Sequence, residues 1–240
     1  MYRLEAPGED TPSDWASLYR ARGGEIPPHR PIFTGDIFVG LSVPGEIEPT
    51  DVIVLQHPCA IRADGVNLTP RLLVAEVRPW EKVPPPAWET RHYKLMPLVD
   101  LRPGTEPPHY AAFFIDLHVV PRENFDLERR YACLTQKGVN LLMQRWAHHN
   151  TRAVVDTPRF QEVTAAQYEE ADMIEEWCLD REDDGIGPPD AQREIDAWLS
   201  ESVVGSQRRR ELLADPQQRS ALRKAQRQFL REVRLRVEPE

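Results

Sequence analysis

Proline and glycine are distributed very unevenly along this chain of 240 residues. Residues 1–121 contain 18 of the 23 prolines and 8 of the 12 glycines. Both residue types interrupt helices and mark turns, so this half favours short strands joined by turns over long helices. The remaining half is rich in helix-forming residues. We therefore expect a β-rich N-terminal part followed by a helical C-terminal part.

Short apolar segments bounded by turn residues predict five strands in the first half. They are 36–43, 51–56, 71–78, 95–101 and 110–120. Only loops separate them, and strands at this spacing are typical of a compact barrel or an open roll.

Apolar periodicity and capping residues predict helices on both sides of these strands. Helices are expected over 13–20, over 135–150, from Thr164 onward, over 190–200 and over 216–237. Ser13, Thr135 and Thr164 are placed at helix starts because a hydroxyl can accept a hydrogen bond from a free N–H of the first turn. A short strand is also expected at 152–156.

These elements indicate an α+β protein in three parts. Residues 1–29 form an N-terminal helix and extended arm, residues 30–160 form the barrel with one packed helix, and residues 161–240 form a helical extension. The extension has acidic helices first and a basic helix last, because residues 161–202 carry 14 acidic and 2 basic side chains while residues 206–237 have a net charge of +7.

The sequence also predicts the cellular compartment of the protein and whether it needs a cofactor. The chain has no apolar run of membrane length and no apolar N-terminal segment of the secretory kind, so we expect a cytoplasmic protein without a membrane partner. Cys59, Cys133 and Cys178 are too few and too far apart for a disulfide framework or a zinc site, which also fits a reducing compartment. No phosphate-binding loop or metal-binding motif is present, so we expect no cofactor and no metal.

The charge separation has two interpretations. The acidic and basic helices can pair with each other, or the basic helix can contact nucleic acid or an acidic partner. Apolar residues such as Leu222, Phe229 and Leu230 are interleaved with the arginines, so one face of the last helix is expected to be buried.

The densest group of chemically useful residues directly follows the most apolar strand. Within 56–62, His57 can act as a general base, Cys59 as a nucleophile and Arg62 as a clamp for phosphate. The alternative is a structural turn in which His57 bonds to the backbone and Cys59 packs as a small apolar residue.

Residues 30–39, 52–55 and 72–78 together resemble the opening strands of PemK/MazF-like proteins. That family consists of small SH3-like β-barrels and includes the toxin endoribonucleases of bacterial toxin–antitoxin systems. The resemblance covers about residues 30–80 and implies a bacterial SH3-like barrel. Residues 42–51 are acidic where the toxins carry a basic segment, and Arg78 follows the third strand where the toxins place a serine or threonine, so the resemblance favours the fold over the catalysis.

Our leading hypothesis is a non-catalytic accessory protein of a toxin–antitoxin or phage-defence type system. It would bind nucleic acid, RNA or DNA, or a partner protein, and a homodimer is compatible with this role. The candidate binding residues are Arg62, Arg71 and Arg78 near the barrel rim, and Arg208, Arg209, Arg210, Arg223 and Arg227 on the extension. Two alternatives stay open: a metal-independent endoribonuclease with His57 as base and Arg62 as phosphate clamp, and a purely protein-binding assembly module.

Overall fold

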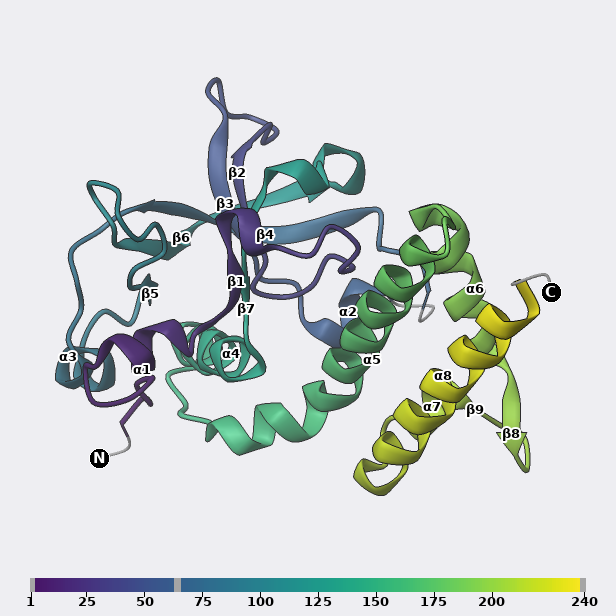
Figure 1. Ribbon diagram of the computed structural model, residues 1–240. Coiled ribbons are helices and arrows are strands. Elements are labelled where there is room, and N and C mark those ends of the chain that lie inside the picture. The colour runs from purple at the N-terminus through teal and green to yellow at the C-terminus, as the bar shows by residue number, and fades with distance from the viewer. Residues whose placement is uncertain (1–2, 63–65, 238–240) are drawn as a thin grey trace. The chain divides into compact units, whose positions relative to one another are not determined.

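The computed structural model describes residues 3–62 and 66–237. The chain divides into two compact units (Figure 1). The first, termed the sheet unit, contains residues 1–28 and 32–163, and the second, termed the helical unit, contains residues 29–31 and 164–240. The N-terminal arm therefore belongs with the sheet, except for three residues that join the helical unit.

The sheet unit is built on one antiparallel sheet that curls into a half-barrel (Figure 1). Its strands are β1 (Tyr19–Arg22), β2 (Ile37–Leu41), β3 (Thr50–Val54), β4 (Arg71–Pro79), β5 (Leu95–Leu98), β6 (Tyr110–Pro121) and β7 (Arg130–Leu134). Their spatial order is β1-β7-β2-β3-β4-β6-β5. The predicted α+β class is confirmed, and each of the five predicted strand segments contains a strand.

The sheet contains two strands that the sequence did not predict, β1 and β7. The helix expected over 13–20 is shorter than predicted: α1 (Pro12–Ala16) is capped by Thr11, and β1 begins three residues after it. The four residues of β1 pair with β7, with Tyr19 opposite Leu134. A strand this short is stable only with a partner, and that partner lies more than 100 residues further along the chain.

A buried ion pair joins β7 to β2. The Arg130 Nη1 lies 3.1 Å from the Asp36 Oδ2, and the two side chains are 0% and 2% exposed. Asp36 also accepts a hydrogen bond from the Phe33 N–H, and Arg130 donates to the Pro27 carbonyl. Apolar side chains of β2, β3, β4 and β6 pack together in the adjoining core.

Short helices and one long helix complete the sheet unit. They are α2 (Pro58–Ile61), α3 (Pro85–Thr90) and α4 (Gln136–Thr151). Thr135 is the predicted N-cap of α4, and its hydroxyl accepts a hydrogen bond from the Gly138 N–H at 3.0 Å.

Helix α5 (Thr157–Asp183) begins earlier than predicted, and the strand expected at 152–156 is not formed. The Thr157 N–H donates to the Glu5 carboxylate at 2.9 Å, and the Thr157 hydroxyl donates to its second oxygen. The N–H of the first helical residue is thus bonded to a side chain 152 residues away, which no local signal could indicate. Thr164, the expected cap, is buried within the helix.

The helical unit contains most of α5 and the remaining elements. These are α6 (Pro188–Ser200), the hairpin β8 (Ser202–Val204) and β9 (Gln207–Arg208), α7 (Arg209–Leu212) and α8 (Pro216–Val237). Trp177 of α5 stacks on Phe229 of α8 with ring centroids 5.3 Å apart, and Leu222 and Leu230 are buried in the same core. The prediction that one face of the last helix is buried is confirmed.

Among the helices that the structure describes, none combines the length and the apolar character needed to cross a membrane.

Replacing Arg130 by methionine is expected to destabilise the protein strongly. The variant leaves the buried Asp36 carboxylate without its countercharge, so the free energy of unfolding should fall by about 3–5 kcal/mol, measured by urea-induced unfolding. The control is Arg3→Ala, because Arg3 is exposed and pairs with Glu89 at the surface, where the loss should be below about 1 kcal/mol. Equal losses in the two variants would contradict this role for the buried pair.

Candidate functional site

The two residues predicted to act in RNA cleavage both bond to the backbone. His57 is the N-cap of α2, and its Nδ1 accepts a hydrogen bond from the Cys59 N–H at 3.2 Å. The Arg62 Nη1 donates to the Ile32 carbonyl at 3.1 Å. The His57 contact is that of the structural turn weighed as the alternative for this segment, although Cys59, which that alternative packs as a small apolar residue, is exposed.

Burial shifts the pKa values of the two titratable side chains of this turn, His57 and Cys59. It lowers the pKa of His57, so the imidazole is more strongly held in the neutral form, which is the form that can cap the helix. Burial also raises the pKa of the Cys59 thiol, which opposes formation of the nucleophilic thiolate. Burial therefore does not activate Cys59 as a nucleophile.

The predicted basic residues of the barrel rim have different surroundings. Arg71 is exposed at the start of β4. Arg78 lies at the other end of the same strand, where its guanidinium donates to Glu76 and pairs with Asp116 at 2.9 Å. The hydrogen bond to Glu76 is the main reason that the pKa of Arg78 is raised. The charge of Arg78 is thus largely used within the protein.

Glu76 also contacts His118 on the neighbouring strand β6. The His118 Nε2 lies 2.7 Å from the Glu76 Oε1. Burial raises the pKa of Glu76, but the hydrogen bonds from His118 and Arg78 outweigh it and hold that pKa below its usual value. Among the described residues, Glu46, Glu76 and His118 are the group whose geometry could hold a metal ion.

The three consecutive arginines of the extension lie around α7 and are mostly paired. The Arg209 Nη1 donates to the Trp198 carbonyl at 2.8 Å, and the Arg209 guanidinium stacks over the Trp198 ring. Arg210 pairs with Glu170 at 2.8 Å and with Asp196 at 3.1 Å. Arg208 is exposed, and its backbone N–H is bonded to Glu211.

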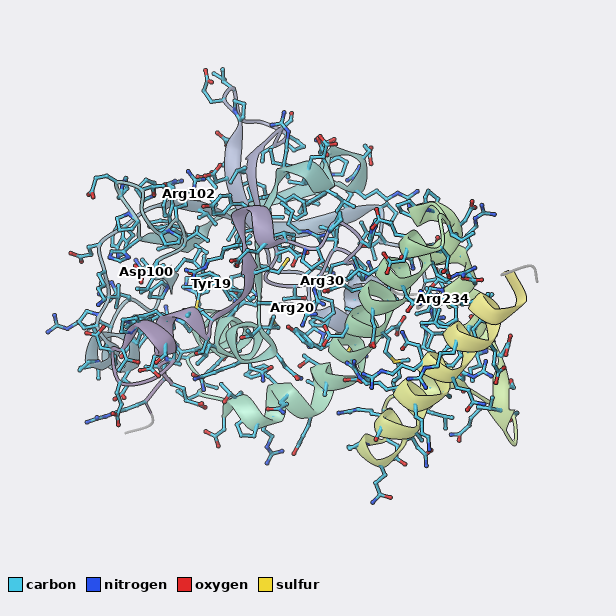
Figure 2. All side chains as sticks on the ribbon, in the orientation of Figure 1. Tyr19, Arg20, Arg30, Asp100, Arg102 and Arg234 are labelled. Carbon is cyan, nitrogen blue, oxygen red and sulfur yellow. The ribbon has the colours of Figure 1, made fainter. Side chains whose placement is uncertain are left out.

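The acidic helix α5 and the basic helix α8 pair with each other, as one interpretation of the charge separation predicted. Arg223 contacts Glu169, Glu176 and Asp172, and the hydrogen bond to Glu169 is the first cause of its raised pKa. Arg234, labelled in Figure 2, pairs with Asp180 of α5 at 3.0 Å and with Asp184, the residue after α5, at 2.9 Å. Much of the positive charge of α8 is therefore compensated within the helical unit.

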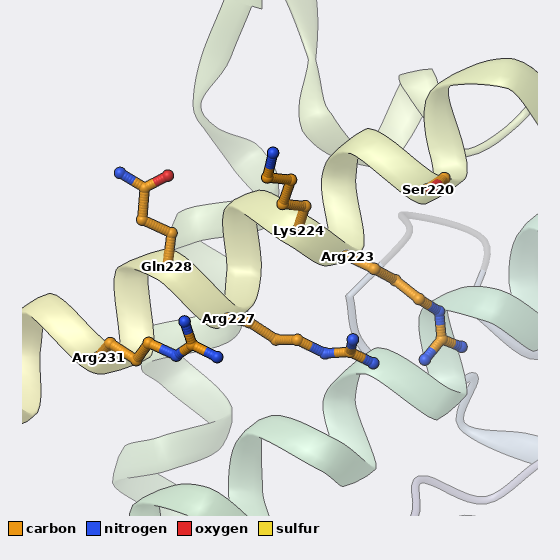
Figure 3. Close-up of a pocket in the computed structure, with 6 residues that line it drawn as sticks. All are labelled: Ser220, Arg223, Lys224, Arg227, Gln228 and Arg231. Carbon is orange, nitrogen blue, oxygen red and sulfur yellow. The ribbon is translucent and has the colours of Figure 1, made fainter.

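Some cations of α8 nevertheless have few or no ion-pair partners among the residues that the structure describes. An open pocket of about 740 Å³ is lined by Ser220, Arg223, Lys224, Arg227, Gln228 and Arg231 (Figure 3). In Figure 3, Arg223 and Arg227 extend toward the neighbouring helix, whereas Lys224 and Gln228 point to the opposite side. We define the basic face as Lys224, Arg227 and Arg231, which are exposed.

Of the predicted binding residues, Arg223 and Arg227 line this pocket together. Two further cations of the pocket, Lys224 and Arg231, were not predicted as binding residues. Both were part of the counted charge run. Their helical spacing relative to Arg227 was the available signal, because residues three, four and seven apart lie on one helix face. Arg208 and Arg209 do not line this pocket.

Acidification is expected to weaken the capping contribution of His57. Because burial lowers the pKa of His57 in the folded state, the stabilisation is present above the unfolded pKa of about 6.5 and is lost as pH falls below it. The comparison is with His57→Asn, which can cap the helix but does not titrate. The difference in free energy of unfolding, wild type minus variant, should decrease from about pH 7 to about pH 5, by at most about 1.4 kcal/mol per pH unit. A pH-independent difference would exclude this coupling, since the other histidines are common to both proteins.

Comparison with protein-family models and with curated proteins identifies no relative of this chain. No family model matches it, and no curated protein matches its sequence. The resemblance of residues 30–80 to the PemK/MazF-like family therefore stays a prediction, and the function is argued from the charges and contacts described above.

Proposed function

We propose that the protein is a non-catalytic binding module that holds nucleic acid on the basic face of α8. The observation that carries this proposal is the uneven pairing of cations along that helix. Arg223 contacts three carboxylates and its side chain is 29% exposed, whereas Arg227, whose side chain is 58% exposed, pairs with only one carboxylate of the described residues, that of Glu176. In the part of the chain that the structure describes, neither Lys224 nor Arg231 makes an ion pair.

The spacing of these cations suits an extended polyanion. Lys224 and Arg231 are seven residues apart, which corresponds to about 10 Å along the helix axis. Phosphates follow one another every 3.4 Å or so along the axis of each strand of a DNA duplex, so the face spans about three of them. Arg227 lies between the two ends, and its guanidinium can donate two parallel hydrogen bonds to a phosphate. Ser220 and Gln228 add further polar groups to the same pocket.

The overall charge predicts how such binding would behave. The chain has a formal net charge of -9, so long-range attraction to nucleic acid is weak and the contact depends on the local face. Few phosphates would be contacted, and the affinity should be modest and strongly dependent on salt. A toxin–antitoxin or phage-defence setting follows only from the PemK/MazF-like resemblance and stays a prediction, as does a homodimer.

Removing the basic face is expected to abolish most of the binding. The variant Lys224→Ala/Arg227→Ala/Arg231→Ala should weaken binding to a labelled single-stranded RNA and to a DNA duplex by at least about tenfold. The slope of log K against log salt concentration should fall by about 2–3, since each lost phosphate contact removes roughly 0.7–0.9. Both quantities are measured by fluorescence anisotropy over a series of salt concentrations.

The matched control removes three positive charges elsewhere. Arg3, Lys82 and Arg193 are at least partly exposed and each pairs with one carboxylate, so their triple alanine variant has the same net charge as the test variant. It should bind as the wild type does. Equal binding by both variants would overturn the proposal. If the wild type binds a polyglutamate peptide through the basic face but binds neither RNA nor DNA, the proposed ligand is wrong and the partner is an acidic protein.

The same assay tests the endoribonuclease alternative. End-labelled RNA incubated with the wild type in the presence of EDTA should stay intact if the protein only binds. Cleavage that disappears in His57→Ala would support the endoribonuclease and would contradict the non-catalytic proposal.

A further inference from the structure

A histidine and a glutamate on neighbouring strands of the sheet unit are already paired. In the register of the sheet, Val74 of β4 lies opposite His118 of β6, and Glu76 lies opposite Val52 of β3. Side chains two residues apart on a strand share a face, so Glu76 points to the same side as Val74. Val74 and Val52 belong to the buried core. Glu76 and His118 therefore lie at the edge of that core, with side chains 12% and 15% exposed.

A turn between β2 and β3 brings a second carboxylate to this pair. The Glu46 N–H donates to the Val43 carbonyl at 3.1 Å and closes a turn over Pro44 and Gly45. Gly45 has a φ of 94°, the left-handed conformation that glycine adopts without strain at this position of a turn. Val43 is buried and anchors the turn to the core. One ligand atom each of Glu46, Glu76 and His118 then lies within 4.8 Å of the other two.

These three donors have the composition of a site for a transition metal. One imidazole nitrogen and two carboxylate oxygens suit Mn²⁺, Fe²⁺, Co²⁺ and Zn²⁺, and three protein ligands leave coordination positions open. Bonds of about 2.0–2.2 Å to such an ion require the donor atoms to be roughly 3.3 Å apart. Glu76 and His118 are already close, at 2.7 Å, and Glu46 is exposed, so its side chain can move the remaining distance from solvent.

The neighbouring charges favour a divalent cation. Arg78 donates to Glu76 Oε2, which leaves Oε1 directed at His118, and the second partner of Arg78 is Asp116. Hydrogen bonds that orient a ligating carboxylate in this way are typical of metal sites. The carboxylates of Glu46, Glu76 and Asp116 and the guanidinium of Arg78 have a formal charge of -2 in total, which one divalent ion would neutralise.

We propose that Glu46, Glu76 and His118 bind a divalent transition-metal ion, with the His118 Nε2 and one oxygen of each glutamate as ligands. The His118 Nε2 gives up its hydrogen bond to Glu76 and coordinates the ion as the tautomer protonated at Nδ1. No metal is expected from the sequence, because the three ligands are separated by 30 and 42 residues and form no motif. The site is independent of the basic face of α8, so either proposal can fail without the other.

The test uses Co²⁺ as a spectroscopic probe and Zn²⁺ as a competitor. The full-length protein, freed of metal with a chelator, should bind one equivalent of Co²⁺ with visible absorption bands that Zn²⁺ abolishes. His118→Ala and Glu46→Gln should each weaken binding at least tenfold, measured by isothermal titration. Glu46 is exposed, so its variant keeps the fold and separates loss of a ligand from loss of structure.

The matched control is His109→Ala. His109 pairs with Asp100 at 3.2 Å in the same unit, and in the described part of the chain that pair has no third ligand within reach. This variant should bind Co²⁺ as the wild type does. The proposal is overturned if the wild type binds no stoichiometric metal up to about 1 mM, or if Glu46→Gln and His118→Ala bind as tightly as His109→Ala.

Discussion

The sheet unit depends on the buried ion pair between Asp36 and Arg130. These residues are 94 positions apart, and their contact places β7 between β2 and β1. A buried pair adds little net stability, since both charges lose their hydration, but a misplaced strand would leave one of them buried and uncompensated. We infer that the pair selects β7 as the partner of β2. The free edge of β7 then pairs with the four-residue strand β1, so that β7 and β1 complete the half-barrel on this side.

The helical unit uses charge differently. Its acidic and basic segments are consecutive in the sequence, and they come together as α5 packs against α8 through apolar side chains such as Trp177 and Phe229. Arg30, labelled in Figure 2, also uses its charge within this unit, since its guanidinium contacts Asp172 at 2.6 Å and Glu175 at 2.8 Å. This explains why three residues of the N-terminal arm belong to the helical unit. The charges of Arg30, Arg210 and Arg223 are therefore compensated within the helical unit, and the basic face of α8 is the part that we propose for a ligand.

The two proposed sites differ in how a sequence could reveal them. The basic face lies within one helix, so its residues recur at helical spacing and are readable from the sequence once the helix is assigned. The proposed metal site joins a hairpin turn to two strands, and its members converge only through the register of the sheet. His57 is a third case. An imidazole directly after an apolar strand suggested a general base, but His57 accepts a hydrogen bond from the Cys59 N–H and so caps a helix. A reactive residue type is therefore weak evidence until its partners are known.

The sequence by itself determined the class of the fold, five strand segments, the cap of α4 at Thr135 and the amphipathic last helix, because each of these follows from residues close together in the chain. The charge separation was also visible in the sequence, but the sequence did not decide whether the basic helix pairs with the acidic helices or contacts a ligand. Only the tertiary structure decided that α5 starts at Thr157, because Glu5 caps it, and that Tyr19–Arg22 is a strand, because β7 lies beside it. It likewise decided which arginines are compensated and which carboxylates surround His118. The physical reason is common to all four: a side chain or backbone group is satisfied by a partner far away in sequence, and local propensity carries no information about that partner.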